Sequence, residues 1–268
     1  MGRLPTAFVT HGGGPWPLIP LDVFDESERL SLKAYFERIK DIPASQPKAI
    51  LLISAHWEGP NFTLNTNPDP KLLFDYYGFP DEAYDFQWSP RTDLVLASEV
   101  EGLIRDKGFD VDSNNKRDFD HGVYIPLMLS YPNAEVPIVQ LSLRRNLSPE
   151  DHLKCGEALA SLRDQGVFII GSGNSYHNIG QMFSPSTRSI QESKQFDQWL
   201  KEALSLDDKS RRDKLVQWEM APGAKQCHPR EEHLLPLMVV VGAAGVDDCH
   251  VTWSGSVNGT SNSAFHFG

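Results

Sequence analysis

Three histidines each follow an apolar run that has the composition of a buried strand. They are His11, His56 and His177, and the runs before them are residues 7–9, 49–55 and 167–170. Gly or Ser lies within two residues of each histidine, as is typical of the turns that end strands. The carboxyl ends of parallel strands meet at the edge where open α/β sheets bind ligands, so we expect these imidazoles to converge there. Neutral imidazole binds Zn, Fe or Cu and also transfers protons near neutral pH, which makes metal binding and acid–base catalysis the candidate chemistries.

Three further histidines lie in motifs of their own. His121 occupies the Asp-His-Gly turn at residues 120–122, and His228 and His233 lie within residues 227–237. The separation of the last two is five residues, which would place them about 140° apart on one helix at ~100° per residue. They are therefore not expected to be paired ligands on one helix face, as the histidines of a zincin are. We expect His228 to bind the metal just before the helix and His233, one turn in, to support the site without binding the metal itself.

Strands that alternate with helices predict one α/β domain over residues 1–268. Its mostly parallel central sheet would be flanked by helices, with the metal site at the carboxyl edge of the strands. Besides the three runs above, strands are expected at residues 61–64, 136–141 and 247–254. Helices are expected at residues 24–42, 93–107, 149–164 (capped by Ser148), 190–204, 209–218 and 231–243.

Composition excludes several classes of protein. The 268-residue chain has a formal net charge of −11, which disfavours nucleic acid because phosphate binding needs a basic face. The longest apolar run, residues 234–244, is interrupted by Pro and Gly and is too short to span a bilayer, so no membrane association is expected. No signal peptide is recognisable at the N-terminus. Three cysteines without metal-finger spacing fit a reducing, cytoplasmic location.

Six motifs together carry a resemblance to a known family. They are residues 10–15 (THGGGP), 54–58 (SAHWE), 77–80 (YGFP), 120–122 (DHG), 171–178 (GSGNSYHN) and 228–237 (HPREEHLLPL). In this order they resemble the class III extradiol ring-cleaving dioxygenases, most closely the branch similar to 4,5-DOPA dioxygenase. The resemblance extends over nearly the whole chain.

The resemblance implies a non-haem metal held by His11, His56 and His228. His177 matches the family's catalytic histidine and can also lie against the metal. His121 would be a second acid or base or a hydrogen-bond donor to the substrate. Fe(II) is the metal that this resemblance implies for the active form, whereas three neutral ligands would also suit Zn(II). The substrates would be a catechol and O₂, with Tyr77 and Phe79 forming walls around the ring.

Two alternatives remain open at this stage: a zinc-dependent hydrolase or lyase on the same scaffold, and a non-catalytic interaction protein of the same fold. The oligomeric state is also open. If the substrate is a DOPA-like or other carboxylated catechol, its carboxylate needs a cationic partner. Arg144, Arg145 and Lys225 are the expected candidates.

Overall fold

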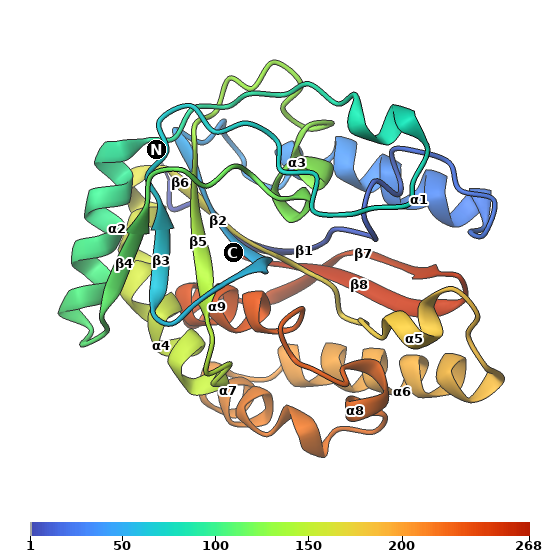
Figure 1. Ribbon diagram of the computed structural model, residues 1–268. Helices are drawn as coiled ribbons and strands as arrows, with labels where there is room; N and C mark the ends of the chain where they lie inside the picture. The colour runs from blue at the N-terminus through green and yellow to red at the C-terminus, as the bar shows by residue number, and fades with distance from the viewer. Residues whose placement is uncertain (1) are drawn as a thin grey trace.

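One β-sheet organises the part of the chain that the structure describes, residues 2–268 of a computed structural model (Figure 1). Its strands there are β1 (Thr6–Thr10), β2 (Ala49–Gly59), β3 (Phe62–Asn65), β4 (Val111–Asn114), β5 (Ile138–Arg144), β6 (Val167–Gly173), β7 (Cys249–Val257) and β8 (Thr260–Phe267). They lie in the order β4-β3-β5-β2-β6-β1-β8-β7. The pairs β1–β6, β2–β6, β2–β5 and β3–β4 are parallel, and the other three are antiparallel. The expected α/β fold with a mostly parallel sheet is thus confirmed.

Helices cover both faces of this sheet (Figure 1). They are α1 (Glu26–Glu37), α2 (Leu94–Asp106), α3 (His121–Leu127), α4 (Pro149–Leu159), α5 (Ile179–Met182), α6 (Thr187–Leu204), α7 (Asp208–Val216), α8 (Ala224–Cys227) and α9 (Leu235–Ala244). In β2, Ile50 packs into the core beneath α1 and α3, whereas Leu51 packs into the core with α4 and α9. This alternation explains why the central strands are apolar throughout, since both faces are buried. Among the described residues, no helix combines the length and apolarity that crossing a bilayer requires.

The parallel register brings the carboxyl ends of β1, β6 and β2 together. Thr10 pairs with Gly173, and Ser54 pairs with Ser172. β2 continues to Gly59, beyond the expected residue 55, so that His56 lies within the strand rather than after it. The register between β2 and β5 shifts between Ile53 and Glu58, which is the segment that carries His56.

Several boundaries differ from the sequence expectation for identifiable reasons. The first helix begins at Glu26 because the Asp25 carboxylate accepts hydrogen bonds from two backbone amides of the first turn. The Ser148 cap of α4 is confirmed by its hydrogen bond from Asp151 N (3.2 Å). The strand β8 was not expected. Its signal is the turn at Asn258–Gly259, where both residues have positive φ, the conformation that a two-residue hairpin requires.

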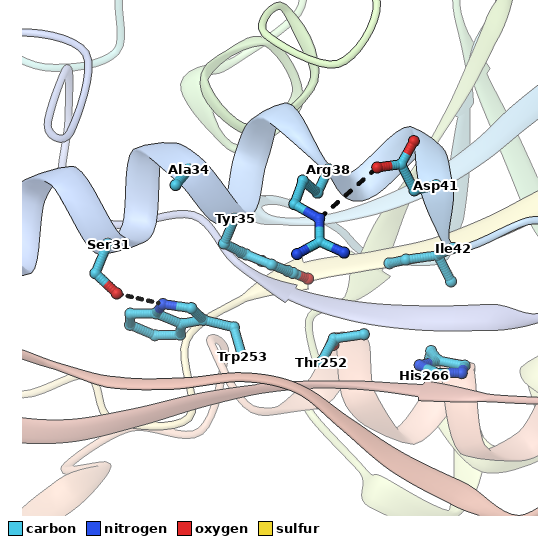
Figure 2. Close-up of a pocket in the computed structure, with 9 residues that line it drawn as sticks. All are labelled: Ser31, Ala34, Tyr35, Arg38, Asp41, Ile42, Thr252, Trp253 and His266. Atoms are coloured by element: carbon cyan, nitrogen blue, oxygen red, sulfur yellow. Dashed lines mark hydrogen bonds and ion pairs between the residues drawn. The ribbon is translucent and has the colours of Figure 1, made fainter.

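A cleft of about 530 Å³ lies between α1 and the β7–β8 hairpin (Figure 2). On its floor Trp253 stacks against Tyr35 and donates its indole N–H to Ser31 Oγ (3.0 Å). His266, which lines this cleft, pairs with Ala7 in the first half of β1, whereas His11 follows the last residue of that strand. The cleft shares no lining residue with the histidine cavities described below, so its greater volume does not make it the candidate active site.

Candidate metal centre and active site

Three imidazoles converge at the carboxyl edge of the sheet. Nε2 of His56 lies 3.1 Å from Nε2 of His11 and 3.2 Å from Nε2 of His233. His11 directly follows β1, His56 lies in β2, and His233 lies in the turn before α9. Nε2 of His56 therefore lies close to the Nε2 atoms of both other rings.

Hydrogen bonds on the other ring nitrogen define the tautomers of two of these histidines. Ser172 Oγ donates to the carbonyl of Gly122 (2.5 Å) and is thus free to accept from His11 Nδ1 (3.0 Å). The Glu232 carboxylate accepts from His233 Nδ1 (2.8 Å). In both residues the proton sits on Nδ1, which leaves the Nε2 lone pair directed into the cluster.

Burial keeps all three imidazoles neutral. The pKa values of His11, His56 and His233 are lowered well below the ordinary value, first by burial and then by neighbouring histidines. Nitrogen atoms that share a metal at about 2.1 Å lie roughly 3.0–3.4 Å apart, which matches the two distances above. Three neutral imidazoles with converging lone pairs therefore fit a Zn(II) or Fe(II) ion.

His121 faces the same cluster from the first turn of α3. Asp120 places it there, because its buried carboxylate caps the helix at Gly122 N (3.1 Å) and accepts from Ser54 Oγ (2.6 Å). Asp75 Oδ1 accepts from both the ring Nδ1 (2.7 Å) and the backbone N (3.0 Å) of His121. Its other oxygen lies 3.7 Å from His56 Nδ1. Asp75 was not expected at the site from the sequence, although it lies two residues before Tyr77.

His177 stacks on His233, with ring centroids 3.3 Å apart and an interplanar angle of 16°. Its Nδ1 lies 3.1 Å from the same Glu232 oxygen that holds His233. The structure thus brings His11, His56, His121 and His177 to one region, as expected from the sequence, and adds His233 to them. Ring nitrogens of His11, His56 and His121 lie close enough to share a metal ion, and so do the ligand atoms of His177, Glu232 and His233.

The expectation that His228 stands beside His11 and His56 is wrong. Its side chain is fully buried in the core against Phe196 and Trp218, and its Nε2 lies 3.0 Å from the carbonyl of Ser175. Burial lowers the pKa of His228 to about 4. His228 therefore stabilises the segment that carries His177, and His233 takes the position beside the other imidazoles.

His228 and His233 differ from the expectation because α9 begins later in the chain than predicted. The helix was expected from residue 231, but it begins at Leu235, with Pro236 in its first turn, where proline is favoured. His233 consequently lies in a turn, where the helical angle of 100° per residue does not apply. Its carbonyl accepts from Asn174 N (3.0 Å), and a Cβ on Gly173 would lie only 2.1 Å from that oxygen. The glycine after β6 is what allows His233 to approach the cluster.

A cavity of about 360 Å³ opens onto the cluster. Tyr77 and Phe79 line it, as expected from the sequence, together with Tyr76 and the glycines that follow His11. Tyr77 is 92% exposed, so it lies at the mouth, whereas Phe79 packs edge-on against the buried Tyr76. The walls are thus largely aromatic, with histidines at one end.

A second cavity, of about 430 Å³, shares His56, His177 and His233 with the first. It contains Arg230, whose guanidinium is bound through two 2.6 Å contacts to Glu58.

The cations expected from the sequence lie elsewhere. Arg144 pairs with Asp151, and Lys225 pairs with Glu219 and lies over Trp218. Neither they nor Arg145 line either cavity.

Comparison with known proteins bears on this geometry. Residues 21–267 match the family described as the catalytic LigB subunit of aromatic ring-opening dioxygenase. A 4,5-DOPA dioxygenase extradiol of Beta vulgaris is 36% identical over 257 residues, covering 94% of this chain and 92% of that protein. The dioxygenase tasH of Hapsidospora irregularis is 35% identical over 271 residues, covering 94% of this chain and 82% of that protein. The crystal structure of an uncharacterized protein from Escherichia coli K12 has a TM-score of 0.79 at 24% identity, covering 99% of this chain and all of that one. This structural similarity supports the fold alone.

Proposed function

Because this chain belongs to the family of the catalytic LigB subunit of aromatic ring-opening dioxygenases, we propose that it opens the ring of a catechol with O₂ at an Fe(II) centre. The family makes the chain an extradiol dioxygenase, and the metal and substrate are our inference. The observation that carries it is the convergence of three neutral Nε2 atoms beside an aromatic cavity. We propose His11, His56 and His233 as the metal ligands.

When bound, Fe(II) would supply the redox chemistry that joins a chelated catechol to O₂. The protein's own residues must remove the two catechol protons and later return one. His177 and His121 are the candidates, because both line the cavity and neither is among the three proposed ligands. Each has a carboxylate on Nδ1, which leaves Nε2 to accept a proton from the substrate. We assign His177 as the main acid and base and His121 as a second one or as a donor to the substrate.

The aromatic walls support a flat substrate ring. Tyr76, Tyr77, Phe79, Met182 and Phe183 all line the cavity. Such walls exclude water from the ring while the histidines at the end of the cavity provide its polar contacts. The free thiols of Cys155, Cys227 and Cys249 support our inference that the protein acts in a reducing, cytoplasmic compartment. We also infer that residues 1–268 form one catalytic domain.

Oxygen uptake tests the proposed function directly. Apoprotein loaded anaerobically with Fe(II) is expected to consume one O₂ per catechol and to yield a ring-opened product. Protein loaded with Zn(II) should consume none, because zinc has no redox chemistry. An oxygen electrode with product spectra measures both. Turnover by the zinc form without O₂ would instead indicate a hydrolase or lyase, and absence of turnover by either form over a panel of catechols would contradict the proposal.

Arg230 is the cation placed to bind a substrate carboxylate. Its side chain is half exposed and borders the cavity that shares His56, His177 and His233 with the aromatic cavity. We expect Arg230→Gln to raise KM for a carboxylated catechol about tenfold or more, the effect of losing a charge-assisted hydrogen bond, and to leave KM for catechol nearly unchanged. Arg145→Gln, at an exposed position outside the cavities, is the control. Equal changes in KM for both substrates would exclude Arg230 as the anchor.

A further inference from the structure

Two histidines of the site are held by a single carboxylate oxygen. Glu232 Oε1 accepts from His233 Nδ1 at 2.8 Å and lies 3.1 Å from His177 Nδ1. The two rings are stacked nearly parallel, and their Nδ1 atoms lie on the same side of the stack because both contact this one oxygen. One residue is therefore able to orient both a histidine of the metal cluster and the histidine proposed to move protons.

The surroundings hold Glu232 in place. It is only 9% exposed, and its Oε1 accepts from His233 Nδ1 at 2.8 Å. Arg230 Nη1 lies 3.5 Å from the second oxygen of Glu232 and is itself fixed by Glu58. A carboxylate oxygen accepts hydrogen bonds, so its contacts with the two Nδ1 atoms favour the Nδ1–H tautomer of both imidazoles.

We propose that Glu232 is the positioning residue that holds His233 and His177 together in the Nδ1–H tautomer, thereby directing both Nε2 atoms toward the metal and the substrate. The part of this proposal that concerns proton transfer rests on the proposed function. The part that concerns metal binding rests only on the proposed ligand His233 and is independent of ring opening. His11 provides an internal comparison, since Ser172 rather than a carboxylate holds its Nδ1.

Glu232→Gln and Glu232→Ala separate this role from a general effect on folding. The amide of Gln keeps an acceptor oxygen and the shape of the side chain but loses the charge, whereas Ala removes the acceptor altogether. Calorimetric titration of apoprotein with Zn²⁺ should show affinity falling about 10-fold for Gln and about 100-fold for Ala, the range expected for an outer partner of a metal-bound histidine. Glu231→Gln and Glu231→Ala are the matched controls, because the neighbouring Glu231 side chain makes no hydrogen bond or ion pair among residues 2–268.

The tautomers provide a readout that a merely structural role would not change. In ¹⁵N spectra of the imidazoles, Glu232→Ala should convert the His233 and His177 signals to tautomer mixtures and leave His11 unchanged. Unaltered tautomers and unaltered Zn²⁺ affinity in both variants would overturn the proposal. Loss of zinc from Glu232→Gln as complete as from His233→Ala would also overturn it, because Glu232 would then be a ligand. Absence of ring opening in the wild type would refute the proposed function but would leave these two measurements decisive for Glu232.

Discussion

His233→Ala is expected to empty the metal site, whereas His228→Ala is expected to keep it. The Nε2 atom of His233 lies 3.2 Å from that of His56, while Nε2 of His228 is engaged by a backbone carbonyl in the core. Removal of one of three ligands should cost more than the roughly 10–100-fold in affinity that loss of an outer partner costs. Metal content of the purified variants and titration of their apoproteins measure the effect.

The same two variants should rank the other way in stability: His228→Ala is expected to lower the free energy of unfolding more than His233→Ala. His228 is fully buried among aromatic side chains, so His228→Ala should leave a cavity and lower the free energy of unfolding by about 2–4 kcal/mol. His233→Ala should change the stability of the apoprotein less, because the ring borders a cavity rather than a packed core. Comparison of denaturant midpoints of the two apoproteins checks this. If His228→Ala lost the metal while His233→Ala retained it, the assignment of His233 rather than His228 as the ligand would be reversed.

The positions of His11 and His56 could be predicted because they depend on strands alone, and that of His177 because it follows β6 closely. Apolar runs buried on both faces are recognisable in the sequence, and parallel pairing brings their carboxyl ends together whatever the loops do. His121 could be placed near them from its glycine-containing turn. Asp120 offered a further signal, since aspartate is a favoured N-cap residue, and Asp120 caps α3 in the structure.

Their spacing could not show which of His228 and His233 reaches the other imidazoles, because this depends on where one helix begins. A helix that starts at residue 231 and one that starts at Leu235 predict different directions for His233, and only Pro236 distinguishes them. Asp75 and Glu232 were missed for another reason. The contacts of Asp75 with His121 and of Glu232 with His177 join residues far apart in the sequence, and nothing in the local pattern of either carboxylate specifies these partners.

His177→Phe is expected to keep the metal and to slow ring opening by roughly 10²–10⁴, the contribution of one general acid or base. Phenylalanine is the appropriate replacement because it can preserve the stack on His233 while removing both nitrogens. Metal content should therefore remain close to that of the wild type, and the loss should appear in kcat. Single-turnover product formation under O₂, with metal analysis of the same sample, measures both quantities. His250→Phe is the matched control, since His250 is exposed on β7.

Each alternative role of His177 predicts a different result for this variant. If His177 binds the metal, as the resemblance to the family allowed, His177→Phe should lose metal and activity together, and adding excess metal should restore part of the activity. If His121 is the principal acid and base, His177→Phe should keep nearly full activity, and His121→Phe should show the 10²–10⁴-fold loss instead. His121 can take that role because Asp75 holds its Nδ1 in the same manner as Glu232 holds that of His177. Retained metal with a loss confined to kcat is the outcome that assigns proton transfer to His177.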